Sequence, residues 1–344
     1  MQMTSTSTFE NALHWPQDKC PPIIWSVAGT DSGGGAGLMA DARAAAALGV
    51  HLCPVVAAVT AQNSHAVEQV FALAPEQIQA QLDALSSDMR PQAIKTGLLG
   101  SVQAVELVAR CIDRLRLTGP VALVIDPVLR ASSGAMLVDG AVLQAYRELL
   151  LPRATLITPN EAEARRLLDA PFATASELAQ RLLALGAEAV CITGGDSRAD
   201  AALALDYLAT AQASGWLALP RLTSAKNNHG TGCTFASGAA AALARGFVTA
   251  DALVLAKMLT WCALRDGHAA GAGPGPVRAS PGFLFDRAAL PVLGWGEPLA
   301  DGELERWQAI FDEASHPTEN FGLYAITDQP ERIATLAKAG LRHA

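Results

Sequence analysis

The feature that most constrains the fold is a regular alternation of short apolar runs with longer, helix-length segments. The apolar runs lie at 22–29, 52–60, 92–97, 121–127, 154–160 and 189–195. Segments rich in alanine and leucine separate them, at 36–48, 75–87, 101–116, 139–150, 160–168 and 175–186. Strands that are apolar on both sides and separated by helices are typical of a parallel sheet with both faces covered. We therefore expect a three-layer α/β/α domain with a mostly parallel central sheet.

The chain also suggests where this domain begins and ends. Residues 203–224 predict two antiparallel strands, and two long helices are expected at about 233–246 and 249–268. The domain should span 22–285, after a flexible lead-in at 1–21 that lacks the features of a secretion signal. Residues 286–319 are interpreted as a linker. The last stretch, 320–344, predicts one strand and one helix, which cannot bury their own apolar faces.

Composition excludes several classes of function. The chain is 51% hydrophobic and carries a net charge of −8, so it can bury a large core and lacks the basic surface that nucleic acids or anionic membranes require. No run approaches the roughly 18 apolar residues of a membrane span. The six cysteines form no CxxC pair, and the histidines show no metal-binding spacing. We expect a cytoplasmic protein that binds neither nucleic acid nor membrane.

Several predicted strands end in polar or glycine-rich sequences, namely "AGTDSGGGAG", "KTGLLG", "DPV", "TPNEAE" and "TGGD". Any one of them could be an ordinary turn. In an open parallel sheet, however, the carboxyl ends of the strands form the ligand-binding crevice. Five such endings in succession therefore predict one shared site.

The stretch "HGTGCT" points to phosphate chemistry. Gly230, Thr231 and Gly232 allow a sharp turn before a helix, so that the first amides of the helix could form an anion hole for a phosphoryl group. Cys233 at the same helix start is expected to have a lowered pKa and to accept a proton from a substrate hydroxyl. The alternative is a small, packed and inert residue.

Three further residues predict a metal and phosphate region. Asp126 ends a strand, and Asn160 and Glu163 form N-x-x-E at the start of a helix. Oxygen ligands of this kind suit Mg²⁺ bound together with nucleotide phosphates. Asn160 and Glu163 could instead form a capping box, and both roles are compatible. Thr193 in "TGGD" could border a triphosphate or belong to a turn.

Two stretches predict a pocket for a small ring. "AGTDSGGGAG" is neither a Walker A motif nor a dinucleotide fingerprint, but its backbone could approach a ligand closely, with Asp31 or Asp41 as a polar contact. Gln62 in "TAQNS" has an amide that both donates and accepts, which matches a heteroaromatic ring bearing a nitrogen and an amino group. In isolation Gln62 would be read as a surface turn residue.

Taken in order, these motifs resemble those of hydroxymethylpyrimidine and phosphomethylpyrimidine kinases, which are thiamine-biosynthesis enzymes of the ribokinase-like superfamily. The resemblance covers about residues 22–285 and rests on "AGTDSGGGAGLMAD", "AVTAQNS", "AIKTGLLG", "IDPV", "LITPNEAE" and "NNHGTGCT". It implies a ribokinase-like fold and ATP-dependent phosphorylation of 4-amino-5-hydroxymethyl-2-methylpyrimidine and of its monophosphate. Pyridoxal kinases are the group most easily confused with this one.

The resemblance also implies roles on the substrate side. Cys233 would be the catalytic base, and Gln62 would recognise the pyrimidine. Gly29 and Asp41 would lie near the hydroxymethyl group and the ring, and Leu98 would form an apolar wall.

On the nucleotide side, the resemblance places Asp126 and Glu163 near Mg²⁺ and the ATP phosphates. Many members of the family carry a lysine where this chain has Thr193. Loss of a cation that faces phosphate should weaken ATP binding unless another group replaces it.

Two alternatives to this activity follow from the sequence. One is a pyridoxal or pyridoxine kinase, and the other is a pyrimidine-binding pseudoenzyme that transfers no phosphate. Family analogy predicts a homodimer. The final "FGLYAITD" resembles the first strand of thiamine-phosphate synthase, a barrel of roughly 200 residues or more, so the segment 320–344 would be only its beginning.

Overall fold

The computed structural model describes residues 20–129, 138–195, 202–222 and 226–294. The strands in these residues are β1 (Ile23–Gly29), β2 (His51–Gln62), β3 (Val67–Ala72), β4 (Ala93–Thr96), β5 (Ala122–Ile125), β6 (Leu156–Ile157), β7 (Val190–Ile192), β8 (Leu203–Ala209), β9 (Ser214–Pro220) and β10 (Val292–Gly294). They form one sheet in the order β10-β9-β8-β7-β6-β5-β4-β1-β2-β3. The pairings from β2 through β7 are parallel, and those at both edges are antiparallel.

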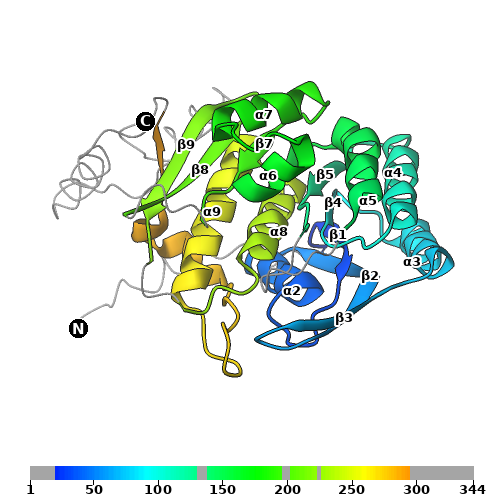
Figure 1. The fold of residues 1–344 in the computed structure, drawn as a ribbon, viewed down its shortest axis with the longest axis horizontal. Coiled ribbons are helices and arrows are strands. Elements are labelled where there is room, and N and C mark those ends of the chain that lie inside the picture. Colours follow the sequence, from blue (N-terminus) through cyan, green and yellow to red (C-terminus); the bar gives the residue numbers. More distant parts are fainter. Residues whose placement is uncertain (1–19, 130–137, 196–201, 223–225, 295–344) are drawn as a thin grey trace, which may run out of the picture.

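The helices lie on both faces of this sheet (Figure 1). One layer contains α3 (Pro75–Asp88), α4 (Val102–Arg116), α5 (Gly140–Ala145), α6 (Glu161–Leu168) and α7 (Ala175–Ala184). The other contains α2 (Gly37–Ala47), α8 (Thr231–Ala244) and α9 (Thr249–Arg265). The predicted three-layer α/β/α class is confirmed. Among the described residues, no helix has the length and apolarity that crossing a membrane would need.

The apolar runs become central strands because neighbouring side chains point into different layers. In β1, Trp25 and Val27 belong to the core under α3 and α4, whereas Ile24 belongs to the core under α2 and α8. This period of two gives each face of the sheet its own buried surface.

The alanine-rich sequence of α8 reflects its central position. The helix packs between α2 and α9 and against the sheet, and most of its residues are buried. A Cβ atom on Gly238 would lie 3.1 Å from Leu259 Cδ2, so small side chains allow the two helices to approach closely. Close packing holds the start of α8, with Cys233, firmly above the sheet.

Two strands were not predicted from the sequence. β3 pairs with β2 in an antiparallel hairpin and is exposed along most of its length. β10 pairs with β9, so the sheet extends past the predicted domain end at residue 285 and into the predicted linker. Residues 1–19 and 295–344, including the stretch that resembles a barrel strand, lie outside the described part of the chain.

Candidate active site

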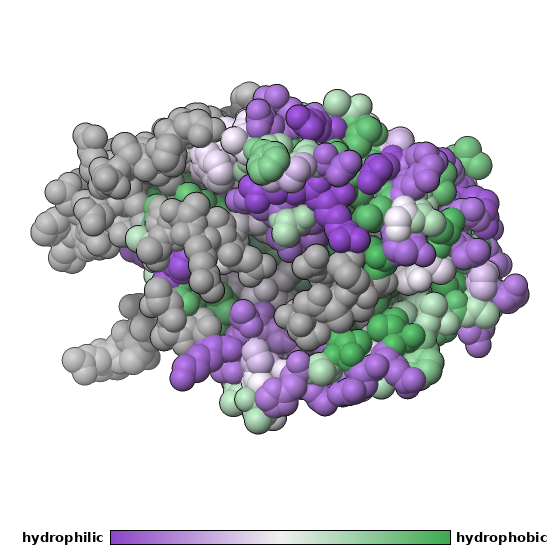
Figure 2. Space-filling view, in the orientation of Figure 1, coloured by the Kyte–Doolittle hydropathy of each residue, from purple (hydrophilic) through white to green (hydrophobic). Residues whose placement is uncertain are grey.

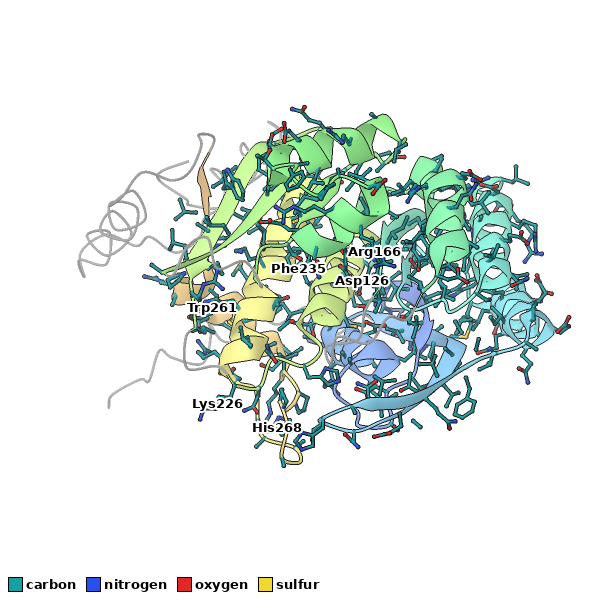
Figure 3. The ribbon with its side chains drawn as sticks, viewed as in Figure 1. Asp126, Arg166, Lys226, Phe235, Trp261 and His268 are labelled. Atoms are coloured by element: carbon teal, nitrogen blue, oxygen red, sulfur yellow. The ribbon has the colours of Figure 1, made fainter. Side chains whose placement is uncertain are left out.

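A cavity of about 870 Å³ opens at the carboxyl edge of the parallel strands. Most of the residues proposed from the sequence line it, and they come from distant parts of the chain: Gly29, Gln62, Leu98, Asp126, Asn160, Glu163, Thr193, Gly230, Thr231, Gly232 and Cys233. Figure 3 labels three other points on its wall or rim, at Arg166, Phe235 and Trp261. The prediction that the polar strand ends converge on one site is confirmed.

The turn before α8 has the geometry that the sequence predicts for anion binding. Gly230 is in the left-handed region, with φ of 89°, and its carbonyl accepts from Thr234 N–H at 2.9 Å. The N–H groups of Gly232 and Cys233 lie in the first turn, where no carbonyl one turn earlier is available. Thr231 N–H has only a long contact of 3.4 Å to the carbonyl of Asn228. These amides and the helix dipole form a place for an anion at the cavity wall.

Replacing Gly230 with alanine is expected to damage both the fold and the site. The new Cβ would lie 2.2 Å from the Gly35 carbonyl oxygen, and the left-handed backbone adds about 1–2 kcal/mol. Urea unfolding and turnover should both show the loss. Gly140→Ala is a matched control, because that glycine has open space around its Cβ position. If the Gly230 variant matched this control in stability and activity, the turn would not require glycine at position 230.

The environment of Cys233 differs from the sequence expectation. The residue is partly accessible from the cavity, and the backbone N–H of Gly37 favours the charged form of its sulfur. Burial raises the pKa of the Cys233 thiol to about 12, while Lys95 opposes this rise and Asp41 and Asp126 add to it. The predicted lowering of the pKa by the helix start is therefore wrong in direction. At neutral pH the ligand-free site holds a protonated thiol.

A buried ionic cluster lies beneath this thiol. Lys95 is completely buried, with Nζ 3.0 Å from Asp41 Oδ1 and 3.4 Å from Asp126 Oδ2. Burial opposes the charge on Lys95, but the two carboxylates outweigh it and raise the pKa of the lysine. Lys95 was not among the predicted site residues, although a lysine inside the apolar run at 92–97 was a signal.

Asp41 does not occupy the place that the resemblance implied. Ser26 Oγ donates to its Oδ2 at 2.6 Å and Ser237 Oγ to its Oδ1 at 2.7 Å, in addition to the contact with Lys95. The residue is fully buried and does not line the cavity. The expectation that Asp41 contacts substrate is wrong, because sequence alone does not reveal which side of α2 faces the ligand.

Asp126 is the best-placed carboxylate for a metal. It lines the cavity, is 5% exposed, and its Oδ2 accepts no hydrogen bond from the described residues. Burial raises its pKa, Lys95 opposes the rise and Asp41 adds to it. Among the described residues, no group of three potential ligands surrounds a metal position. This donor set fits Mg²⁺ that is bound mainly by nucleotide phosphates and water.

Asn160 and Glu163 form the capping box that was weighed against the metal role. Asn160 Oδ1 accepts from Glu163 N at 2.9 Å, and Glu163 Oε2 accepts from Asn160 N at 3.0 Å. The backbone of Asn160 also forms an isolated parallel β-bridge with Thr193, whose N–H donates to the Pro159 carbonyl. Both side chains still line the cavity, so capping places them at its wall.

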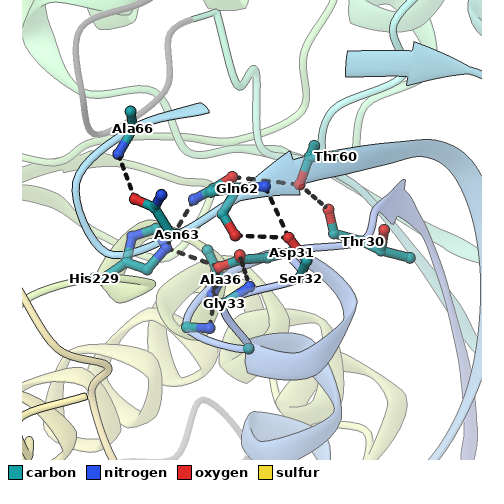
Figure 4. A network of polar contacts seen from close by, with 12 residues as sticks. Thr30, Asp31, Ser32, Gly33, Ala36, Thr60, Gln62, Asn63, Ala66 and His229 are labelled. Carbon is teal, nitrogen blue, oxygen red and sulfur yellow. Dashed lines mark hydrogen bonds and ion pairs between the residues drawn. The ribbon is translucent and has the colours of Figure 1, made fainter. Parts of the chain in front are cut away.

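A polar network joins the loop after β1 to the turn before α8 (Figure 4). Asp31 accepts hydrogen bonds from the N–H groups of Gly33, Gly35 and Ala36, and its Oδ2 lies 2.8 Å from His229 Nε2. Burial favours the neutral form of Asp31, but these hydrogen bonds, led by His229, outweigh it and lower its pKa. Asp31 is thus an ionised anchor for the loop.

Gln62 lies next to this network, with its amide 3.1 Å from His229 Nε2. The amide lines the cavity, which places the predicted ring-recognition group within the same space as Cys233. In the sequence, His229 directly precedes the predicted anion hole. Its contact with a residue 167 positions away was not visible in the sequence.

The other end of the cavity contains a second buried ion pair. Lys257 Nζ lies 2.7 Å from Asp206 Oδ2 and donates to the Ala204 carbonyl at 3.0 Å. Asp206 Oδ1 in turn accepts from Gly194 N–H at 2.9 Å, which fixes the turn beside Thr193. This pair joins α9, β8 and the "TGG" turn into one wall.

A crevice at the edge of a parallel sheet, with helix-terminal amides near a thiol and a carboxylate oxygen that accepts no hydrogen bond from the described residues, suits the transfer of a phosphoryl group between two bound molecules. The class defined by this fold and cavity is a small-molecule kinase. Comparisons with known proteins make the class specific: residues 31–278 match the family described as phosphomethylpyrimidine kinase. The chain belongs to this family.

Individual relatives agree with this assignment. The hydroxymethylpyrimidine/phosphomethylpyrimidine kinase of Mycobacterium bovis is 39% identical over 265 residues, which are 76% of this chain and 95% of that protein. The thiamine biosynthesis bifunctional protein ThiED of Geobacter sulfurreducens is 38% identical over 257 residues, 74% of this chain and 51% of that protein. The predicted pyrimidine kinase of thiamine biosynthesis is confirmed.

Solved structures show the same fold in a neighbouring group. The pyridoxal kinase from Staphylococcus aureus in complex with ADP has a TM-score of 0.70 and 26% identity, and the match covers 80% of this chain and 98% of that one. This likeness confirms the fold class and shows why ring selectivity must be argued from the site.

Proposed function

We propose that this protein uses ATP to phosphorylate the hydroxymethyl group of 4-amino-5-hydroxymethyl-2-methylpyrimidine and then phosphorylates the resulting monophosphate. The observation that carries the proposal is the shared cavity of Gln62, Cys233 and the free amides at the start of α8. Gln62 can bind a nitrogen heterocycle, Cys233 can accept a proton from a hydroxyl, and the amides can bind a phosphoryl group. The names of the relatives support the same substrate.

In the first step, the hydroxymethyl oxygen attacks the γ-phosphorus of ATP, and the bond from that phosphorus to the ADP oxygen breaks. The N–H groups of Gly232 and Cys233 hold the oxygens of the moving group. The sulfur of Cys233 takes the hydroxyl proton, which requires its thiolate form. In the second step the attacking atom is an anionic phosphate oxygen, so no base is needed.

Mg²⁺ would bind at Asp126, with Glu163 at the same cavity wall. Its chemistry would be to neutralise charge on the nucleotide phosphates. The cluster of Asp41, Asp126 and Lys95 carries two carboxylates and one ammonium, and this net negative charge favours a cation.

Arg166 is a candidate to replace the cation that Thr193 lacks. Two arginines of α6 line the cavity, but Arg165 is committed to Glu161 at 2.7 Å. Arg166 is exposed and, within the described part of the chain, has no ion-pair partner. A guanidinium at the rim beside Asn160 and Thr193 could reach nucleotide phosphates.

Replacing Arg166 with alanine is therefore expected to raise KM for ATP by roughly fivefold and to leave KM for the pyrimidine nearly unchanged, because a charge-assisted contact is lost. Steady-state kinetics with each substrate varied in turn would show it. Arg110→Ala is the control, since Arg110 is also exposed but lies on α4 away from the cavity lining. Equal KM values for ATP in the two variants would exclude Arg166.

ADP release coupled to addition of the pyrimidine, with ATP and Mg²⁺ present, tests the proposed function. Release that depends on the pyrimidine, and is faster than with pyridoxal, is expected. Faster turnover of pyridoxal would favour the pyridoxal kinase alternative. Calorimetric binding of the pyrimidine without any ADP release would favour the pseudoenzyme.

We further propose a homodimer in the cytoplasm. Val59 and Phe71 face each other across the β2–β3 pair and are exposed, and Figure 2 shows hydrophobic residues at the surface in the region of these strands. An exposed apolar pair of this kind is suited to contact a second copy.

A further inference from the structure

We propose that His229, held by Asp31, fixes which end of the Gln62 amide faces which way, and so sets the preference of the site for an aminopyrimidine edge. This inference rests on the proposed function, because it concerns the ring that the same cavity accepts. It assigns His229 a positioning role in substrate selection.

The contact between His229 and Asp31 determines which ring nitrogen of His229 carries the hydrogen. Its Nε2 lies 2.8 Å from Asp31 Oδ2, and the histidine side chain is only 13% exposed. Asp31 accepts from three backbone N–H groups, and those bonds and His229 lower its pKa, so it is an ionised group with no hydrogen to give. Two acceptors at this distance would repel each other. His229 Nε2 therefore carries the hydrogen and donates it.

The orientation of the Gln62 amide follows from its two neighbours. The amide end drawn as Nε2 is 3.1 Å from this same His229 nitrogen, and the end drawn as Oε1 is 3.4 Å from Thr60 Oγ1 (Figure 4). The two ends of an amide fill nearly the same space, so the hydrogens of their neighbours decide which is oxygen and which is nitrogen. The single Nε2 hydrogen points to Asp31 Oδ2 at 2.8 Å and is shared with this end of the amide at 3.1 Å, where the carbonyl oxygen of Gln62 can accept and a second N–H would be repelled.

Thr60 agrees with this orientation. Its hydroxyl donates to the Thr30 carbonyl at 2.9 Å, which uses its one hydrogen. Its oxygen can then accept from the NH₂ group of Gln62 at the other end of the amide. The opposite orientation would set two donors against each other at His229 and would point the Gln62 oxygen at a hydroxyl whose hydrogen is already used. The orientation with the oxygen toward His229 avoids both conflicts.

The orientation of the amide determines which ring edge it can bind. After these contacts, the amide retains one oxygen lone pair and one N–H in a fixed order. An aminopyrimidine presents an amino group beside a ring nitrogen, and glutamine pairs with such an edge through two hydrogen bonds, as it does with adenine. A pyridine ring offers its nitrogen without the adjacent amino group and can satisfy only one of the two. If the Gln62 amide were free to rotate, the site would lose its preference for an aminopyrimidine over a pyridine.

The test compares 4-amino-5-hydroxymethyl-2-methylpyrimidine with the analogue that lacks the 4-amino group. In the wild type, kcat/KM should favour the amino compound. His229→Leu should lower this ratio about tenfold, mainly through KM of the amino compound, because one well-placed hydrogen bond is lost. His229→Gln, which keeps an N–H at a similar reach, should retain much of the ratio. A purely structural role would lower kcat/KM for both compounds alike and leave the ratio unchanged, which would overturn the inference.

Two further measurements keep the test decisive. In a Gln62→Ala background, His229→Leu should no longer change the ratio, because the amide to be oriented is absent. If His229→Leu does not fold, Asp31→Asn should lower the ratio instead, since it removes the ionised acceptor. Calorimetric binding of the two compounds gives the same ratio without phosphate transfer. Absent turnover by the wild type would therefore refute the proposed function, whereas an unchanged binding ratio in the variants would refute this inference.

Discussion

Cys233→Ala is expected to lower kcat for phosphorylation of the hydroxymethyl compound by about 10²–10⁴-fold, the usual contribution of a general base. Phosphorylation of the monophosphate should fall much less, because its attacking oxygen is already anionic. Cys233→Ser should resemble the alanine variant, since a serine hydroxyl is a weaker base than a thiolate. Separate assays of the two steps would measure the difference, with Cys20→Ser as the control for an exposed thiol. Equal losses in both steps would reject this division of roles.

The pH dependence follows from the direction of the Cys233 shift. Burial raises the pKa of this thiol to about 12, so its base form is scarce at neutral pH and increases with pH. The first step should therefore accelerate by roughly tenfold per pH unit between about pH 7 and 9, without reaching a plateau. The second step and the alanine variant should lack this slope. A plateau near neutral pH would contradict the raised pKa of the Cys233 thiol.

Lys95→Met is expected to lower the free energy of unfolding by about 3–5 kcal/mol, the usual cost of leaving buried charges without their partner. Asp41 and Asp126 would both lose the ammonium that lies 3.0 Å and 3.4 Å away. Urea unfolding at pH 8 would show the loss. Adding Asp41→Asn should restore part of it, since one uncompensated carboxylate is then removed.

This deficit should also depend on pH. Burial already raises the pKa of Asp126 and Lys95 opposes that rise, so without Lys95 the folded-state pKa of this carboxyl rises further above the unfolded value and its charged form destabilises the fold. Stability should return as the pH falls and Asp126 takes up a proton, making the deficit smaller at pH 5 than at pH 8. A Lys95→Met variant within about 1 kcal/mol of wild type at pH 8 would contradict the ionic cluster as described.

Most of the fold could be predicted because its central strands are short, apolar and separated by helices. The exceptions are instructive. β3 is exposed along most of its length, so burial leaves no clear pattern in its sequence, and it exists because β2 offers it an edge. β10 is three residues long and depends on β9 in the same way. Such strands are determined by their partners more than by their own residues.

The site was predictable where the backbone decides the chemistry. The turn at Gly230 and the capping box at Asn160 follow from local sequence, and the structure forms both. Contacts between distant residues were not predictable. Asp41 is polar in sequence but buried by Lys95, Ser26 and Ser237, and the direction of the Cys233 shift depends on that same cluster. Burial of a group is a tertiary property, and it reversed the effect expected from the helix start.

The central claim is that the amides opening α8 receive the phosphoryl group beside Cys233 while Gln62 holds the ring. A crystal structure with Mg·ADP, aluminium fluoride and the aminopyrimidine tests it most directly. We predict the fluorine atoms of the aluminium fluoride at about 3 Å from the N–H groups of Gly232 and Cys233. The hydroxymethyl oxygen should lie next to the Cys233 sulfur, and the ring edge should contact the Gln62 amide. An anion bound elsewhere in the cavity, with the ring away from Gln62, would contradict the account.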